Sequence, residues 1–201
     1  MDPVDIKPDV AYQGGIEIFH NAWQDPEKTI SIVEEECNSS SSMSWERADI
    51  RGYDYKGIDS IRTNLHTGIT HYADQGNKVA QQLHNKIADM MEPYSQSYMY
   101  RHRILGVDHT HEWYMMLKYS GGQKFDAHVD GMPGSDRFLS CILYLNDDYE
   151  GGELEFVYYD LKLKMPKGSL IIFPSYFSHA HIAHPVLSGT KYAVVTWLIM
   201  K

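Results

Sequence analysis

The sequence contains no long hydrophobic run. Its longest apolar stretches are short segments such as 169–173 and 192–199, whereas a helix that crosses a bilayer needs roughly 20 consecutive apolar residues. The first 15 residues are polar and acidic, so they lack the apolar stretch of a secretion signal. We therefore expect a cytoplasmic protein without a membrane partner.

Cysteine and clustered basic residues are also scarce. Only Cys37 and Cys141 occur, which excludes a disulfide scaffold and favours a reducing compartment. The net charge is −9, and residues 1–60 hold 13 acidic but only 5 basic side chains. A protein that binds a phosphate backbone needs a basic stripe, so we expect no nucleic-acid partner.

The amino-terminal half has the pattern of a supporting region. Residues 1–15 indicate an extended arm, and the alternation over 15–20 indicates a first strand. Asp25 before Pro26 predicts a capped helix that ends at the serine run 39–42. Glycines scattered over 45–68 predict short strands and a mobile loop, and apolar residues at helical spacing from Ile69 predict one long helix up to Pro93.

From about residue 98 onwards the pattern changes to short strands separated by turn residues. Eight strands are predicted, over 112–119, 124–130, 137–146, 153–158, 160–165, 169–173, 178–183 and 191–199. Strands at such regular spacing favour a barrel or jelly roll. We therefore predict one mainly β (α+β) domain over 1–201, in which residues 1–97 form a helical and loop support for a jelly-roll core formed by 98–201.

One short motif stands at the end of the second of these strands. Residues two apart on a strand point to the same side, so His128 and Asp130 can present an imidazole and a carboxylate to one point. The sequence FSHAHIAHP over 177–185 offers His179, His181 and His184 as a third ligand. Two histidines and one carboxylate suit Fe(II) oxygen chemistry. Strand periodicity places His179 and His181 on one face and does not choose between them.

Four segments resemble the Fe(II)- and 2-oxoglutarate-dependent oxygenases of the prolyl 4-hydroxylase type. They are YSGGQKFDAHVD (119–130), GGEL (151–154), GSLIIFP (168–174) and HIAHPVLSGTK (181–191). The resemblance covers about 112–199 and implies a double-stranded β-helix, or jelly roll, with flanking amino-terminal helices. It also implies that His128, Asp130 and His181 are the iron ligands, because His181 has the family spacing to Pro185 and to Lys191. His109 and His111 have no such support and are interpreted as strand surface.

The resemblance further implies a complete set of cosubstrate residues. Lys191 is similar to the cation that receives the distal carboxylate of 2-oxoglutarate, and Tyr144, Tyr119 and Trp197 are similar to residues that line its pocket. Fe(II), 2-oxoglutarate and O2 are then required, and ascorbate is expected to support activity. The implied reaction is a hydroxylation coupled to decarboxylation of 2-oxoglutarate to succinate and CO2.

The substrate is the open part of this interpretation. Arg62, Thr63 and Asn64 resemble a segment near the substrate in prolyl hydroxylases, so a peptide or protein that contains proline is the leading hypothesis, with residues 45–68 as a lid or as an ordinary surface loop. A free amino acid or other small molecule is the alternative within the same chemistry. A non-catalytic jelly-roll module that only binds metal is the third reading; Lys191 and Tyr144 argue against it, because such a module has no use for a buried cation.

Overall fold

The computed structural model of the chain describes residues 5–39, 42–48, 58–132 and 134–201. The helices are α1 (Pro26–Asn38), α2 (Ile58–Ile61), α3 (Ile69–Asp74) and α4 (Lys78–Arg101). The strands before residue 130 are β1 (Val10–Tyr12), β2 (Ile16–Phe19), β3 (Glu46–Arg47), β4 (Leu65–Gly68), β5 (His109–His111), β6 (Met115–Ser120) and β7 (Phe125–His128). Those after it are β8 (Arg137–Tyr144), β9 (Glu150–Gly151), β10 (Leu154–Phe156), β11 (Leu161–Leu163), β12 (Leu170–Pro174), β13 (His181–Ala183), β14 (Val186–Ser188) and β15 (Thr190–Met200).

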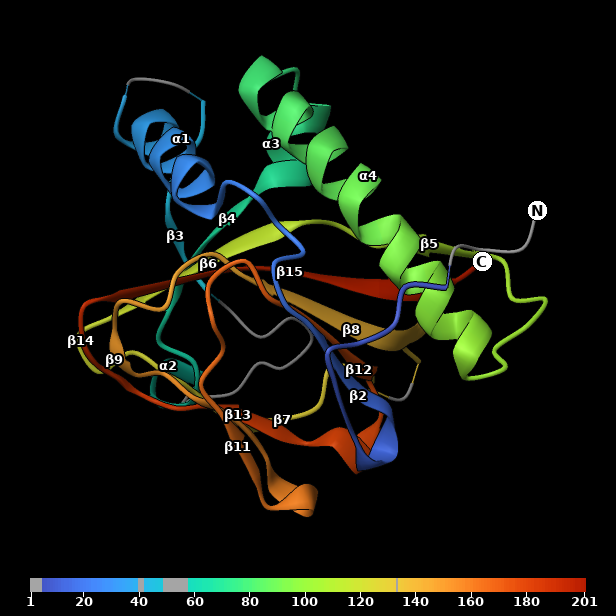
Figure 1. Cartoon of the computed structure of the whole chain (residues 1–201). Coiled ribbons are helices and arrows are strands. Elements are labelled where there is room, and N and C mark those ends of the chain that lie inside the picture. Colours follow the sequence, from blue (N-terminus) through green and yellow to red (C-terminus); the bar gives the residue numbers. More distant parts are fainter. Residues whose placement is uncertain (1–4, 40–41, 49–57, 133) are drawn as a thin grey trace.

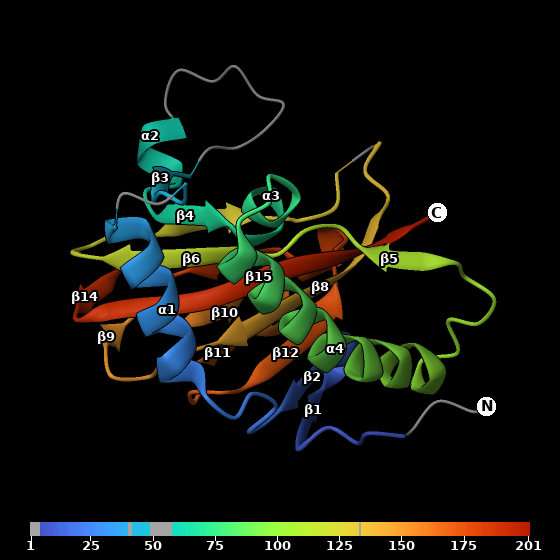
Figure 2. The same cartoon turned by 90° about the horizontal axis from the view of Figure 1, so that it is seen from above.

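Two antiparallel sheets form the body of the molecule. The larger sheet has the strand order β1-β2-β12-β8-β15-β6-β4-β3, and β5 pairs with β15 outside this path. The smaller sheet has the order β11-β10-β13-β7, and β9 pairs with β14. Figure 1 shows α1, α3 and α4 on one side of the larger sheet and the smaller sheet on the other; Figure 2 shows α1 and α4 from above, lying over the strands. The predicted jelly-roll core with flanking helices is confirmed.

All eight predicted strands are present, as β6, β7, β8, β10, β11, β12, β13 and β15. The first predicted strand is β2, but residues 10–12 add β1 to it, where an extended arm was expected. The region 45–68 contains β3, α2 and β4, and residues 49–57 lie outside the described part of the chain, so the predicted loop is not tested there. Within the described residues, no helix combines the length and apolar character needed to cross a bilayer.

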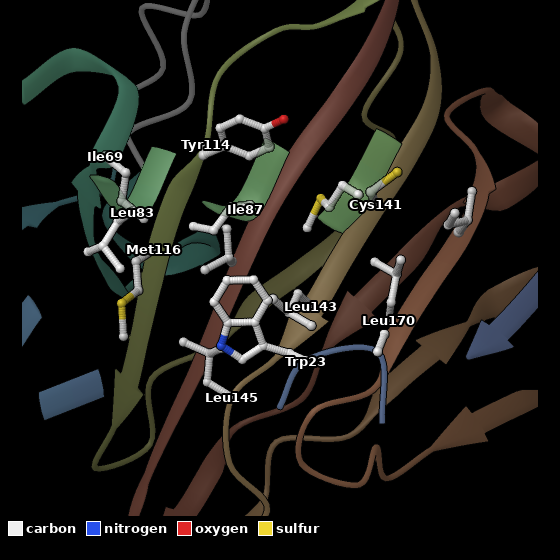
Figure 3. Packing of buried hydrophobic residues seen from close by; sticks show 14 of the residues in the cluster. Trp23, Ile69, Leu83, Ile87, Tyr114, Met116, Cys141, Leu143, Leu145 and Leu170 are labelled. Atoms are coloured by element: carbon white, nitrogen blue, oxygen red, sulfur yellow. The ribbon is translucent and has the colours of Figure 1, made fainter. Parts of the chain in front are cut away.

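The helices are held to the larger sheet by a hydrophobic core (Figure 3). Ile69 of α3 and Ile87 of α4 are fully buried and belong to one cluster with Met116 and Leu143 of the sheet. Burial of a side chain of this size contributes roughly 1.5–3 kcal/mol. This apolar contact covers the outer face of the larger sheet and leaves its inner face to the smaller sheet.

The prediction of a single helix from Ile69 to Pro93 was wrong in two ways: the segment forms two helices, α3 and α4, and α4 continues beyond Pro93. Gly76 has φ +89°, a conformation that favours glycine, and it separates α3 from α4. Asn77 then caps α4, because its side chain accepts a hydrogen bond from the Ala80 N–H at 2.9 Å. Pro93 lies inside α4, which continues to Arg101 because its last turns bury residues such as Tyr98 against the rest of the protein.

Helix α1 begins and ends as predicted, but its cap differs. The Asp25 side chain makes no capping hydrogen bond. Its main-chain oxygen instead accepts hydrogen bonds from the Thr29 N–H and hydroxyl, each at 3.2 Å. The Trp23 indole donates to the same hydroxyl at 2.9 Å. The first turn is therefore closed through the main-chain oxygen of Asp25 and Thr29, and not through the Asp25 side chain.

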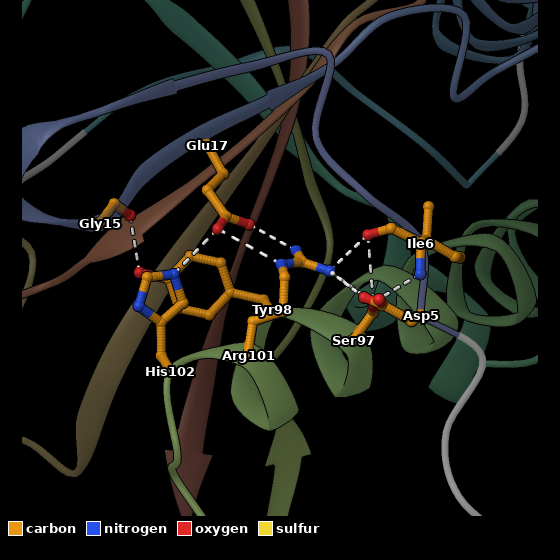
Figure 4. Close-up of polar contacts among 8 residues, drawn as sticks. All are labelled: Asp5, Ile6, Gly15, Glu17, Ser97, Tyr98, Arg101 and His102. Carbon is orange, nitrogen blue, oxygen red and sulfur yellow. Dashed lines mark hydrogen bonds and ion pairs between the residues drawn. The ribbon is translucent and has the colours of Figure 1, made fainter.

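A buried carboxylate joins the end of α4 to β2 (Figure 4). Glu17 is 5% exposed and accepts hydrogen bonds from Arg101 at 2.5 Å and from His102 at 2.9 Å. Arg101 also donates to Ser97 and to the main-chain oxygen of Ile6. Because the carboxylate is removed from water, its partners must satisfy it. This cluster therefore fixes the amino-terminal segment and β2 against α4.

Loss of this carboxylate should destabilise the protein without changing the fold. We expect Glu17→Ala to lower the free energy of unfolding by about 3 kcal/mol, because breaking a buried ion pair leaves a charge without its partner. Urea denaturation followed by circular dichroism measures the difference. Glu35→Ala, at an exposed position of α1, is the matched control and should change little. Equal stability of the two variants would contradict a structural role for the Glu17 cluster.

Candidate metal centre and its cavity

The two histidines of the candidate centre meet because two strands of the smaller sheet pair. β13 runs antiparallel to β7, and His181 lies directly opposite His128 in the register. Residues in such a pair have Cβ atoms about 4.5–5.5 Å apart. The imidazole centroids are 4.2 Å apart, and His181 is 4% exposed. Strand pairing therefore delivers two ligands, far apart in the sequence, to one point.

Each histidine uses one ring nitrogen to fix its orientation. His128 Nδ1 lies 2.8 Å from the Asp126 main-chain oxygen, and His181 Nδ1 lies 3.0 Å from that of His179. A carbonyl oxygen can only accept, so Nδ1 carries a proton, and in the neutral ring Nε2 then keeps its lone pair. This is the arrangement in which a ligating histidine is oriented by a hydrogen bond from its other nitrogen.

Asp130 follows β7 and completes the group. Its Oδ1 lies 3.8 Å from His128 Nε2, and its Oδ2 lies 3.8 Å from His181 Nε2. All three ligand atoms lie within 4.8 Å of one another. Two atoms bonded to one divalent ion at about 2.0–2.2 Å can be up to roughly 4.2 Å apart, so the carboxylate–imidazole distances fit a shared ion. The donor set of two imidazoles and one carboxylate suits Fe(II).

The charges of the three groups also fit a metal. Burial, together with the neighbouring His181, lowers the pKa of His128 to about 3, so its ring is neutral at physiological pH. Burial alone would raise the pKa of Asp130, but His181, His128 and hydrogen bonds from Ser140 and Trp197 lower it. The group therefore presents the neutral imidazole of His128 and the ionised carboxylate of Asp130, the protonation states in which these two groups bind a metal.

The three candidates for the distal histidine lie in different places. His181 lies in the group, whereas His179 belongs to a 3₁₀ turn before β13 and not to the strand. The His179 ring lies against the amino-terminal segment, with its Nε2 2.8 Å from the Gly14 oxygen. The expectation that His179 and His181 share a strand face was therefore wrong. His184 points away from the group and bonds Glu155 at 2.6 Å.

The interpretation of His109 and His111 as strand surface was correct for the strand and wrong for the surface. They form β5, as a strand, but both rings face the Glu92 carboxylate of α4, at 3.5 Å and 3.3 Å. Their side chains are 15% and 8% exposed, so they are largely buried. They lie outside the three-residue group of the metal centre.

The candidate metal centre opens into a cavity of about 790 Å³ between the two sheets. Lys191 of β15 lines this cavity and is 3% exposed. Its Nζ donates to the Gly152 main-chain oxygen at 2.7 Å, and among the described residues it forms no salt bridge. Burial, assisted by the charge of Lys164 and opposed by Glu153, lowers the pKa of Lys191 to about 7.

The three other residues predicted for the cosubstrate pocket line the same cavity. The Lys191 Nζ lies 5.1 Å from the ring centroid of Tyr144 and 5.4 Å from that of Tyr119. Trp197 lies nearer the metal centre, where its side chain forms a hydrogen bond with Asp130. The larger sheet thus contributes the cation and aromatic residues, and the smaller sheet contributes both histidines.

The three residues predicted near the substrate lie beside β7. Arg62 lines the cavity, and its guanidinium lies 4.7 Å from the ring centroid of Phe125. Thr63 exchanges hydrogen bonds with the main chain of Lys124. Asn64 is fully buried and accepts a hydrogen bond from Arg62 Nε at 3.1 Å.

Sequence reasoning missed two residues that contact Asp130. Ser140 donates to its Oδ2 at 2.6 Å, and Ser175 then donates to Ser140 at 2.8 Å because the single Ser140 proton is already used. Arg137 donates to the Asp130 main-chain oxygen at 3.4 Å and lies 3.6 Å from the centroid of the Trp197 ring. A serine within an apolar strand was only a weak indication of a role at the site. The sequence does not give the strand register, which decides where the serine side chain points.

Comparison with known proteins agrees with this geometry. Residues 114–199 match the family model described as the 2OG-Fe(II) oxygenase superfamily. PKHD-type hydroxylases from Stenotrophomonas maltophilia and Shewanella baltica are 37% identical over 92 residues and 38% identical over 93 residues. Each match covers 40% of this chain and 40% of the relative, so the matched part spans well under half the length of these curated relatives.

Solved prolyl hydroxylases share the fold over nearly the whole chain. The viral collagen prolyl hydroxylase of Paramecium bursaria Chlorella virus-1, in complex with 2OG, has a TM-score of 0.67 at 19% identity and covers 92% of this chain and 96% of its own. A Trichoplax adhaerens prolyl hydroxylase in complex with a hypoxia-inducible-factor peptide has a TM-score of 0.72 at 16% identity, with coverages of 93% and 84%. Residues 114–199 thus match the 2OG-Fe(II) oxygenase superfamily, and nearly the whole chain shares its fold with solved prolyl hydroxylases.

Proposed function

We propose that the protein is an Fe(II)- and 2-oxoglutarate-dependent dioxygenase that hydroxylates a peptidyl residue, most simply proline. The observation that carries the proposal is the presence of the His128–Asp130–His181 group and the buried cation Lys191 in one cavity. A site that only bound metal would have no use for a buried lysine, because burying an ammonium group costs free energy unless an anion compensates it.

In this proposal the three ligand residues hold the metal on one face. The Nδ1 hydrogen bonds of both histidines keep Nε2 aimed at the common point. Ser140 and Trp197 keep the Asp130 carboxylate ionised and fixed. Fe(II), when bound there with 2-oxoglutarate and O2, supplies oxidative decarboxylation to succinate and CO2 with insertion of a hydroxyl group.

Lys191 is the residue that we assign to the distal carboxylate of 2-oxoglutarate. It is a point charge on a flexible stem, unlike the planar fork of arginine. Its present acceptor is a neutral main-chain oxygen, that of Gly152, so a carboxylate would be a stronger partner. Tyr144 and Tyr119, beside Lys191, are assigned to the same cosubstrate.

The peptide substrate is the finer part of the proposal. Arg62, Thr63 and Asn64 lie next to the strand that carries His128, and Arg62 reaches the cavity wall, which supports a role near the substrate. The Trichoplax relative of this fold is a prolyl hydroxylase in complex with a peptide fragment. A free amino acid or other small molecule is the alternative, since 790 Å³ also suits a small ligand.

We further propose that residues 1–201 act as one catalytic domain, because strands from both halves of the chain share the larger sheet. Ascorbate is proposed to support turnover. A cytoplasmic location and the absence of a nucleic-acid partner stay predictions of the sequence.

The substrate class is tested by turnover. With Fe(II) and ascorbate, we expect slow formation of succinate from 2-oxoglutarate, increased several-fold by proline-rich peptides, with hydroxyproline detected in the peptide by mass spectrometry. Free proline at equal concentration should give a smaller increase. A larger increase with free proline would select the small-molecule alternative, and no succinate from folded, iron-loaded protein would contradict both.

The ligand assignment is tested by single substitutions. We expect His128→Ala, Asp130→Ala and His181→Ala each to abolish Fe(II)-dependent succinate formation, because each removes one of three ligands. His179→Ala should keep this activity with lower stability, since its ring is bonded to Gly14. His184→Ala should also remain active. An inactive His179 variant beside an active His181 variant would show that the distal ligand is wrongly assigned.

Lys191 should make 2-oxoglutarate binding dependent on pH. We expect Lys191→Met to raise the KM for 2-oxoglutarate about tenfold or more, which corresponds to the 1.5–3 kcal/mol of a hydrogen bond to a charged group, while metal affinity stays unchanged. Because the pKa of Lys191 is lowered to about 7, the wild-type KM should rise by up to about tenfold per pH unit above 7, as the free protein loses the charge.

The matched control is Lys191→Arg, because arginine stays protonated over this range. Its KM should vary little between pH 7 and 9. A wild-type KM that is flat over the same range would mean that the carboxylate is bound elsewhere or that the lysine stays charged.

A further inference from the structure

A three-layer stack lies behind the metal ligand His128. The Phe125 ring lies parallel to the His128 imidazole, with centroids 3.5 Å apart and planes at 11°. The Arg62 guanidinium lies 4.7 Å from the centroid of the same Phe125 ring. Arg62 and Phe125 also form an isolated antiparallel bridge through their main chains. The side chains and backbone of two separate segments thus meet at this ring.

The outer layer of the stack is itself anchored. Arg62 Nε donates to Asn64 Oδ1 at 3.1 Å, and the fully buried Asn64 side chain donates to the Leu65 oxygen at 2.9 Å. The Thr63 N–H donates to the Lys124 oxygen at 3.0 Å, and the Lys124 N–H donates to the Thr63 hydroxyl at 2.8 Å. Residues 62–64 are therefore fixed both to the edge of the larger sheet and to β7.

The His128 ring needs this support because its own hydrogen bond does not define it fully. The bond from Nδ1 to Asp126 restrains the ring, but small rotations about the Cβ–Cγ bond keep this hydrogen bond within range while they shift Nε2 away from the common point. A parallel aromatic ring in contact with one face opposes this rotation. The Arg62 cation over the Phe125 ring holds that ring in place in turn.

We propose that Phe125 and, through it, Arg62 are positioning residues that aim His128 Nε2 at the metal. The inference rests on the proposed role of His128 as a ligand. It assigns to Arg62 a function in the absence of substrate, in addition to the substrate role that its sequence context implied. The segment 62–64 then couples the edge of the larger sheet to the metal centre.

Charge and positioning predict opposite effects for Arg62. A positive charge near the centre repels a metal cation, so Arg62→Met should strengthen metal binding if charge alone matters. If Arg62 acts by holding Phe125, the same substitution should weaken binding. The direction of the change therefore separates the two effects.

The experiment is a titration of the metal-free protein with Co(II), followed by its visible absorption. We expect Phe125→Leu and Arg62→Met each to weaken Co(II) binding about tenfold, the size typical for groups that orient a ligand, and to alter the absorption spectrum. Because Arg62 acts through Phe125, the double variant should bind no more weakly than Phe125→Leu alone. Phe125→Tyr, which keeps the ring, should restore both affinity and spectrum.

Controls separate this inference from the proposed function and from instability. Lys124→Met changes a charge directly before β7 and outside the stack, where Lys124 pairs with Asp126, and should leave the Co(II) spectrum unchanged. Thermal unfolding of each metal-free variant shows whether it is folded. If folded Phe125→Leu kept the wild-type Co(II) affinity and spectrum, or if the losses of affinity were additive in the double variant, the positioning role would be overturned. The proposed function would be unaffected by either result. Failure of the wild-type protein to bind Co(II) or Fe(II) would overturn the proposed function and this inference together.

Discussion

The candidate centre depends on the antiparallel pairing of β13 with β7. This pairing places His181 opposite His128. A shift of one residue would turn one of the rings to the opposite face of the smaller sheet, because side chains alternate along a strand. The same pairing brings Phe125 opposite Ala183 and so places the supporting stack in the same sheet.

The second constraint is the contact between the two sheets, because the site takes groups from both. The loop after β7 is tied to the larger sheet where the Gly131 N–H donates to the Ser175 oxygen at 2.8 Å. Ser140 and Ser175, on paired strands of the larger sheet or just after them, then reach Asp130. Hydrogen bonds in a buried setting are expensive to leave unmade, so this network fixes the carboxylate relative to both histidines.

The cavity holds opposite charges at separate places. The carboxylate lies with the two imidazoles, and Lys191 lies between aromatic rings with a main-chain oxygen as its acceptor. A chelating dicarboxylate could satisfy the lysine and the metal at once, which is why the proposed cosubstrate fits better than a monovalent anion. The amino-terminal half contributes to this arrangement: β2 and β4 extend the larger sheet, and α3 and α4 cover its outer face.

Local sequence patterns were sufficient to predict the eight strands of the carboxy-terminal half, helix α1 and the residue types of the candidate metal centre. Strand alternation, helical spacing and the His128–Asp130 motif each depend only on neighbours in the sequence. It failed where neighbours compete with distant contacts: the break at Gly76, the passage of α4 through Pro93, and the turn that removes His179 from the strand. The family resemblance had already selected His181 by its spacing to Pro185 and Lys191, whereas strand periodicity had left His179 open. Only the tertiary structure decided that Ser140 contacts Asp130 and that Phe125, with Arg62 over its ring, stacks on His128. These facts follow from strand register and sheet packing, which are set by contacts between residues far apart in the chain.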